Sequence, residues 1–238
     1  MSERTTQGGD KDLPAVEMYA KRLEGAADVK RWRLEQRGRA AVAALRMKGF
    51  DALFVATRRD ACEEVLRRIA AGASVGVGGS ITVRELGVLE RLAETGHTLY
   101  DHWQPGLSQE EILAIRRAQL TCDVFLSSVN ALTLAGQLVS TDGIGNRIAA
   151  MTFGPKQVIL AVGANKIVRD LEAAFARIRE KAAPLALKET GAPLPCVQRG
   201  MCGDCHSEER LCRATLVLEC RPLCTETAAL VIGEALGF

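Results

Sequence analysis

The chain has 238 residues, a formal net charge of +2, a hydrophobic content of 47% and an aromatic content of only 4%. This length is enough for one large α/β domain with a real core, or for two small ones. The near-neutral charge and the scarcity of aromatic rings argue against nucleic acid or an anionic membrane as the main partner. No run of eighteen uninterrupted apolar residues exists, so no membrane span is predicted.

Residues 1–13 are polar and lack the apolar core of a secretory signal, so we predict a disordered leader. Without an export signal the chain is expected to stay in the reducing cytoplasm, where disulfides are rare. Residues 14–50 are rich in Ala, Leu, Arg and Glu and are predicted to form a helical N-terminal extension. Gly25 and Gly38 are expected to interrupt or kink it.

From residue 51 to residue 238 short apolar runs alternate with amphipathic segments. Strands are predicted at 51–57, 74–77, 98–100, 124–127, 132–140, 157–162, 214–218 and 229–232. Helices are predicted over 60–71, 81–92, 146–153 and 170–181, and from Ser108, where S-Q-E-E forms a capping box. This alternation predicts one α/β domain with an open, largely parallel sheet covered by helices on both faces.

Ligands of such sheets bind at the carboxyl ends of the strands, where we place the loops 76–82, 141–147 and 163–166. Glycines between a strand and a helix let backbone N–H groups approach an anion, although glycines also serve ordinary tight turns. The residues predicted to bind a small anionic ligand are Gly78, Gly79, Ser80, Thr82, Asn130, Gly143, Asn146, Asn165 and Lys166.

Three charged residues are candidates for catalysis. Arg147 carries a planar fork suited to a carboxylate or a phosphate. Asp142 could act as a base, pair with Arg147 or simply cap a helix. Glu85 lies one turn into the helix after the glycine loop and could face the same crevice or solvent. His102 has no Ser or Cys partner at a telling spacing, so no triad is predicted there.

Residues 195–212 hold four cysteines in the spacing C-x5-C-x2-C-x6-C, namely Cys196, Cys202, Cys205 and Cys212. They lie among glycines and charged residues rather than apolar ones, which favours metal ligation over packing. Only one C-x2-C knuckle is present, so we favour a [4Fe-4S] cluster over zinc. Disulfides and a chance grouping remain alternatives. Cys220 and Cys224 could be further ligands, a redox pair or unrelated cysteines.

Three segments carry a resemblance to a known family: SVGVGGSITVRELG, the run DGIGNRIAAMTFGPKQVILAVGANKIVRDLEAAFARIR, and the cysteine segment followed by the terminal GEALGF. From about residue 73 to residue 238 the chain resembles the LUD-domain family, the lactate utilization proteins. The resemblance implies a fold similar to ribose-5-phosphate isomerase, glucosamine-6-phosphate deaminase and the coenzyme A transferases. It also implies a role in bacterial lactate oxidation, alongside iron–sulfur partner proteins.

Three functions stay open on this basis. The first is a LUD-type protein with a crevice for a hydroxy acid or phosphate and a [4Fe-4S] cluster in a redox or Lewis-acid role. The second is a sugar-phosphate isomerase or coenzyme A transferase-like enzyme with structural zinc. The third is a non-catalytic assembly subunit that docks an iron–sulfur partner. A homodimer is one arrangement that the chain could adopt.

Overall fold

The computed structural model describes the backbone of residues 15–238 and the side chains of residues 25–238. The leader predicted at residues 1–13 lies outside this range. The chain divides into two compact units, one ending at Arg33 and one running from Leu34 to Phe238. Within the part described, no helix is both long and apolar enough to cross a membrane.

The first element, α1 (Ala15–Met47), is continuous through Gly25 and Gly38, so the predicted interruption is wrong. A glycine inside a helix lowers stability by only about 1 kcal/mol, and the good helix formers around it outweigh that cost. A Cβ at Gly38 would lie 2.6 Å from the ring of Phe54, so this glycine also permits close packing. From Leu34 onward the helix belongs to the second unit, and Leu45 is fully buried there.

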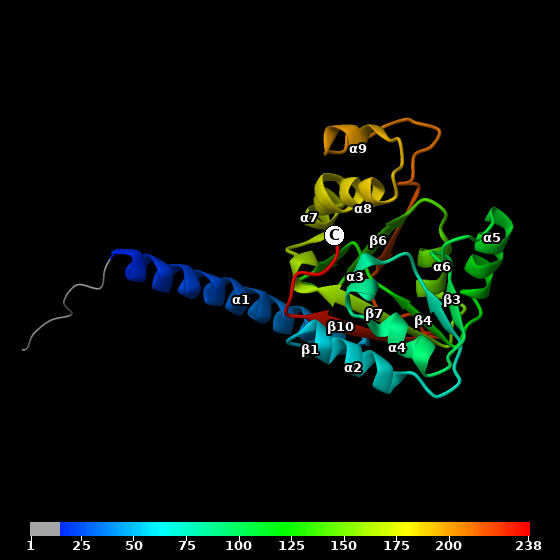
Figure 1. Cartoon of the computed structure of the whole chain (residues 1–238), viewed down its shortest axis with the longest axis horizontal. Helices are drawn as coiled ribbons and strands as arrows, with labels where there is room; N and C mark the ends of the chain where they lie inside the picture. Colours follow the sequence, from blue (N-terminus) through cyan, green and yellow to red (C-terminus); the bar gives the residue numbers. More distant parts are fainter. Residues whose placement is uncertain (1–14) are drawn as a thin grey trace, which may run out of the picture. The chain divides into compact units, whose positions relative to one another are not determined.

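The second unit is built on a six-stranded sheet (Figure 1). Its strands, in spatial order, are β1 (Asp51–Val55), β10 (Glu226–Ile232), β7 (Gln157–Gly163), β4 (Val124–Ser127), β2 (Val75–Val77) and β3 (Leu99–Asp101). Every neighbouring pair is parallel, which confirms the predicted α/β class. All carboxyl ends therefore lie along one edge.

Both faces of this sheet are buried, as the continuous apolar runs of its strands require. In β7, Val158, Leu160 and Val162 enter one core, shared with the end of α1 and with α6 (Asn146–Thr152). Ile159 and Ala161 enter the other core. That second core is covered by α2 (Arg58–Arg68), α3 (Ile81–Glu85) and α4 (Val88–Glu94). Successive side chains of β7 thus enter the two cores alternately. A shift of one residue would exchange the two faces of the strand, so this alternation fixes its register in the sheet.

A second, four-stranded sheet was not predicted. Its order is β8 (Ile167–Val168), β5 (Ala131–Thr133), β6 (Leu138–Asp142) and β9 (Ala214–Leu218). The segment 132–140, expected as one strand, is instead the antiparallel hairpin β5–β6. Gly136, with φ of 80°, makes the turn between them. The predicted strand 214–218 is correct, but it pairs antiparallel with β6 rather than closing the main sheet.

Two predicted helices are divided. Residues 81–92 form α3 and α4, because Gly87 adopts a φ of 68° between them. Residues 170–181 form α7 (Leu171–Arg177), which continues through a π-helical turn (Ile178–Ala182) into α8 (Ala183–Glu189). The capping box at Ser108 is confirmed at the start of α5 (Gln109–Ala118). A short α9 (Pro195–Arg199) packs on α8, and both are yellow to orange in Figure 1.

The β5–β6 turn lies directly against α1, which gives a test of the packing. A Cβ at Gly136 would lie 2.8–2.9 Å from the backbone of Ala44 and Leu45. We expect Gly136→Ala to lower the free energy of unfolding by about 1–3 kcal/mol beyond the backbone strain of a positive φ. Gly72→Ala is the matched control, because Gly72 has a φ of 74° with nothing within 4 Å. Equal losses in urea denaturation would contradict the close contact.

Candidate functional site

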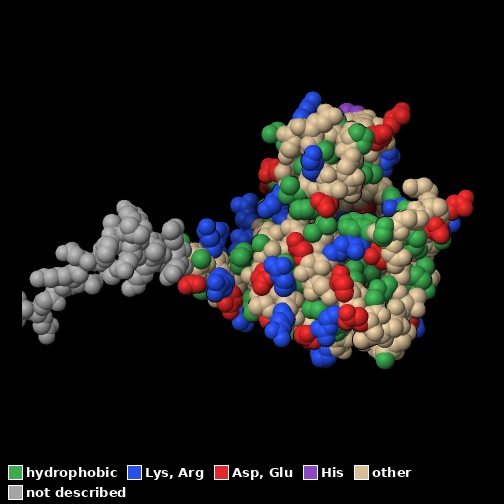
Figure 2. Space-filling model, viewed as in Figure 1, with side chains coloured by type: hydrophobic (Ala, Val, Ile, Leu, Met, Phe, Trp, Pro, Cys, Tyr) green, Lys and Arg blue, Asp and Glu red, His purple; other side chains and the backbone are tan. Residues whose placement is uncertain are grey.

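The crevice lies at the carboxyl edge of the main sheet, where chain segments leave β2, β3, β4 and β7. It holds two adjoining cavities of about 250 and 190 Å³, which share Gly79, Asn130 and Arg147 on their walls. Ala186 and Leu187 of α8 close both cavities from the opposite side. In Figure 2 the surface is hollowed between the lobe that contains α8 and the body below it. The position agrees with the general rule for open α/β sheets.

Lys166 follows β7 and lies on the wall of the smaller cavity. Its side chain is buried, at 4% exposure. The ammonium Nζ donates to the hydroxyls of Thr82 at 2.7 Å and Ser128 at 3.0 Å, and to the carbonyl of Val129 at 3.3 Å. All three partners are uncharged. The described chain therefore holds this ammonium by hydrogen bonds but supplies no counter-charge to it.

The charge state of Lys166 reflects this environment. Burial is the main cause that lowers the pKa of Lys166 to about 7, and the positive charges of Arg177 and Arg147 lower it further. Glu85 acts in the opposite direction but only weakly. Near neutral pH the side chain is therefore poised between ammonium and free amine, as at many functional lysines.

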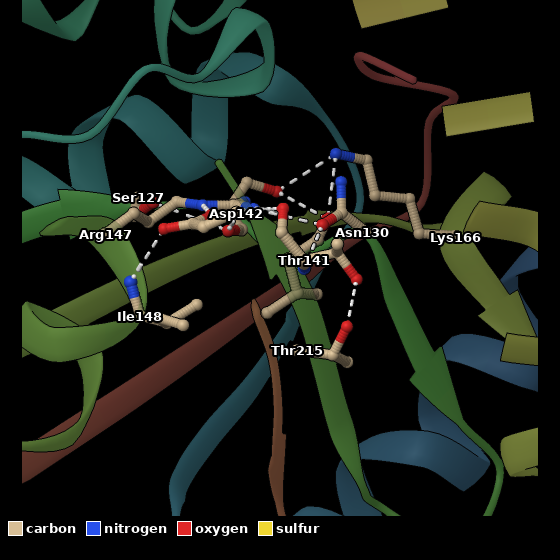
Figure 3. Close-up of polar contacts among 10 residues, drawn as sticks. Ser127, Asn130, Thr141, Asp142, Arg147, Ile148, Lys166 and Thr215 are labelled. Atoms are coloured by element: carbon tan, nitrogen blue, oxygen red, sulfur yellow. Dashed lines mark hydrogen bonds and ion pairs between the residues drawn. The ribbon is translucent and has the colours of Figure 1, made fainter. Parts of the chain in front are cut away.

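Arg147, by contrast, is occupied by the protein itself. It forms a buried ion pair with Asp142, with Nε and Nη2 at 2.8 and 2.7 Å from the same carboxylate oxygen. Its remaining N–H groups donate to the carbonyls of Ser128 and Thr141 and to the side chain of Asn130 (Figure 3). The pairing that the sequence left open between these two residues is present. Arg147 thus holds β6, α6 and the end of β4 together while it lines both cavities.

Two other predicted residues, Asn165 and Glu85, hold the segment that follows β10, and a third, Ser80, caps a helix. The side chain of Asn165 accepts from the N–H of Leu236 at 3.1 Å and donates to the carbonyl of Gly237 at 3.2 Å. Glu85 accepts from the N–H of Gly237 at 2.7 Å. Ser80 caps α3 through its hydroxyl. These contacts place Asn165 and Glu85 beside the crevice as supports for the smaller cavity.

The glycines of the first loop allow close approach. A Cβ at Gly78 would lie 2.7 Å from the hydroxyl of Ser127, and one at Gly79 would lie 3.0 Å from the indole of Trp103. Gly79 lines both cavities. The loop 141–147 follows β6 of the second sheet and not a parallel strand, so its expected place at a parallel strand end is wrong. Gly143 nevertheless lines the larger cavity.

The larger cavity is also lined by His102, for which the sequence predicts no catalytic triad. His102 follows β3, is buried, and its Nδ1 lies 2.9 Å from the side-chain amide nitrogen of Gln119. The oxygen of the same Gln119 amide accepts from the side-chain nitrogen of Asn146, at 3.3 Å. Burial, with a smaller effect of Arg116, lowers the pKa of His102, so it is neutral at pH 7. No sequence motif marks this group, because His102, Gln119 and Asn146 come from separate elements.

Arg177 is a second residue that the sequence did not reveal. It is buried, and it donates to the backbone carbonyls of Asn165 at 3.4 Å and of Asn130. Its Nη2 is buried without a hydrogen-bond partner in the part of the chain that the structure describes. Ser128, which contacts Lys166, was also missed; it directly follows β4 and could have been found from that position.

All four cysteines of the loop 195–212 line one small, enclosed pocket together with apolar side chains. Cys196 is buried, and Cys202, Cys205 and Cys212 are partly buried; all four are free thiols. Burial raises the pKa of Cys196 and of Cys212, and the other thiols of the group raise it further, so the four sulfurs lie within electrostatic reach of one another. Arg210 holds the loop by donating to the carbonyls of Cys205 at 3.0 Å and Cys212 at 2.9 Å.

The cysteine pocket adjoins the crevice. Leu211 and Cys212 line both the pocket and the larger cavity. A Cβ at Gly143 would lie 2.8 Å from Leu211, so the crevice loop and the cysteine loop pack directly together. Two residues after Cys212, Ala214 pairs with Asp142 in the second sheet. The ladder between β6 and β9 therefore fixes the cysteine loop next to the Asp142–Arg147 pair.

The donor set fits an iron–sulfur cluster in its chemistry: four thiols in an enclosed, largely apolar pocket, with a backbone N–H aimed at sulfur. That N–H belongs to Asp204 and lies 3.3 Å from the sulfur of Cys202. Asp204 adopts a φ of 48°, which closes the turn of the C-x2-C knuckle. Within residues 25–238, no three His, Cys, Asp or Glu side chains are arranged to hold a single metal ion.

Comparison with known protein families shows a match over most of the chain. The family model described as the LUD domain matches residues 39–223. Among solved structures, the chain is similar to that of a DUF162 family protein from Deinococcus radiodurans. The two are 13% identical, the match covers 85% of this chain and 97% of that chain, and the TM-score is 0.46. No curated protein matches the chain.

Proposed function

The chain belongs to the LUD-domain family, and from that premise we propose that it is a lactate-utilization-type protein. It binds a small anion, a hydroxy acid or phosphate, in the crevice beside Lys166. The cysteines at 196, 202, 205 and 212 hold a [4Fe-4S] cluster next to the crevice. The protein works in the cytoplasm and exchanges electrons with iron–sulfur partner proteins of lactate oxidation.

One observation carries this proposal: Leu211 and Cys212 form part of both the crevice wall and the cysteine pocket. An anion beside Lys166 would occupy the smaller cavity, which adjoins the larger one that Cys212 lines. Gly203 and Asp204, which line the same pocket, are exposed, so a partner protein could approach a redox centre there.

Several residues of the crevice would contribute to anion binding, each in a different way. Lys166 supplies the positive charge, with Thr82 and Ser128 as hydroxyl donors beside it. Neutral His102 offers a ring nitrogen at the larger cavity. The Asp142–Arg147 pair keeps the walls in position. When bound, a cluster with four thiolate ligands supplies one-electron transfer, since its irons keep no open site for a Lewis-acid role.

Purification under anaerobic conditions, followed by iron, sulfide and zinc analysis, tests the cofactor. We expect about four irons and four sulfides per chain and a brown protein. One zinc without iron would contradict the cluster and favour an isomerase- or coenzyme A transferase-like enzyme. Thermal shift with lactate, inorganic phosphate and coenzyme A then tests the crevice. A protein with a cluster but no shift with any of them would favour an assembly subunit.

The pH dependence of anion binding tests the role of Lys166. An anion beside Nζ stabilises the ammonium form, so above pH 7 binding must take up a proton. We expect the affinity for lactate, which stays a monoanion above about pH 5, to be flat from there to about pH 6 and to weaken about tenfold between about pH 6 and pH 8. Calorimetry in buffers of different ionisation enthalpy measures the proton uptake. Affinity that is independent of pH over this range would remove Lys166 from the anion site.

A further inference from the structure

The environment of the Lys166 amine suits a chemical role beyond that of a positive charge. Its Nζ contacts two hydroxyls and one carbonyl, and no carboxylate of the described chain forms an ion pair with it. A buried lysine is normally paired with an acid, because an isolated ammonium is costly to desolvate. The fold therefore keeps the free-base form of this amine accessible.

The positive charge of Arg177 reinforces this effect. Arg147 is neutralised by Asp142, but the buried Arg177 contacts only backbone carbonyls among the described residues. A lysine that is desolvated and close to another cation is the usual arrangement of a nucleophilic amine. The amine also meets a cavity, since Lys166, Ser128 and Thr82 all line the smaller one.

We propose that Lys166 is a nucleophile that condenses reversibly with the carbonyl group of a small 2-oxo acid to form an imine. The proposal rests on the proposed function, because a 2-oxo acid is the oxidised counterpart of a 2-hydroxy acid that fits the same crevice. It adds a covalent reaction that binding of a hydroxy acid does not require.

Imine formation needs only the Lys166 amine, the 2-oxo acid and the neighbouring hydroxyl groups. The lone pair of Nζ attacks the carbonyl carbon and forms a C–N bond, while the C=O pair moves to oxygen. The oxygen takes one proton from nitrogen through the hydroxyl of Ser128 or Thr82, which lie 3.0 and 2.7 Å from Nζ. The C–O bond then breaks, the second amine proton leaves with the oxygen as water, and the C=N bond remains. Hydrolysis reverses each step, so no oxidant or reductant is needed.

Trapping with borohydride tests the proposal. The purified full-length protein is incubated with pyruvate and sodium borohydride, and the intact mass and the peptide map are recorded. Reduction of an imine fixes an adduct whose mass is one pyruvate minus one water plus two hydrogens. We expect one adduct per chain, located at Lys166. The yield should rise as the pH increases through about 7, opposite to the trend for lactate binding, because the amine must be free.

Variants separate this reaction from non-specific modification. Lys166→Arg keeps a cation without a nucleophilic amine, and Lys166→Met keeps the length without the charge. Both should lose the adduct, and circular dichroism confirms that they are folded. Lys188→Arg is the matched control, since Lys188 is an exposed lysine on α8 beside the same crevice. It should leave the yield unchanged.

The outcomes distinguish the two proposals. An adduct at Lys166 supports the imine. Pyruvate or lactate binding by thermal shift, with no adduct or with adducts spread over exposed lysines, overturns the imine and leaves the anion crevice standing. No binding of either acid, together with no adduct, overturns both.

Discussion

Cys202→Ala is expected to abolish the iron and sulfide content of the anaerobically purified protein and to destabilise the loop 195–212. Cys202 belongs to the C-x2-C knuckle, and its sulfur already receives the N–H of Asp204 at 3.3 Å. With three thiolates left, a cluster keeps one iron exposed to solvent and is lost readily. In the proposed state, binding of the cluster would supply much of the folding free energy of this loop.

The measurement is iron and sulfide per chain together with the visible absorption spectrum. Cys220→Ala and Cys224→Ala are the matched controls, because both cysteines are exposed and neither lines the pocket. They should retain the full cluster. If the Cys202 variant keeps its iron, or if a control loses it, the assignment of ligands is wrong.

Arg147→Ala should lower the free energy of unfolding by about 3–5 kcal/mol, because it leaves a buried carboxylate without its cation. Asp142 is 8% exposed and would keep only the N–H of Ile148, at 3.0 Å. The carbonyls of Ser128 and Thr141 would each lose one donor as well. Chemical denaturation of the purified variant measures the effect.

Arg169→Ala is the matched control. Arg169 pairs with Asp170 at 2.6 Å on the surface, where such a pair contributes at most about 1 kcal/mol. We expect a change of less than about 0.5 kcal/mol there. If Arg147→Ala unfolds as readily as the wild type but loses affinity for lactate or phosphate, then Arg147 is a ligand-binding arm and not a structural one.

Local patterns identified much of the fold. The apolar runs at 124–127 and 157–162 became central parallel strands, and the capping box at Ser108 starts a helix as expected. These signals are local, because strand burial and helix capping are encoded within a few residues. The hairpin at 131–142 was missed because an apolar run around Gly136 reads equally well as one strand. Only its φ of 80° and its contact with α1 reveal the turn.

The candidate site, like the fold, was only partly predictable from local sequence patterns. Lys166, Asp142 and Arg147 were singled out because they follow strands in glycine-bearing loops, and all three lie at the crevice. The sequence could not rank them. It offered both Arg147 and Lys166 as cations for an anionic ligand, whereas the structure occupies the guanidinium of Arg147 with Asp142 and leaves Lys166 facing uncharged partners.

The sequence by itself determined the α/β class, the family and the grouping of four cysteines within eighteen residues, because each depends on composition or spacing along the chain. Only the tertiary structure decided which charges neutralise one another and which cavity the cysteines adjoin. Ion pairing and desolvation depend on distances between side chains from different elements, such as Lys166 after β7 and Thr82 in α3. Those distances exist only once the strands are ordered in the sheet and β9 has paired with β6.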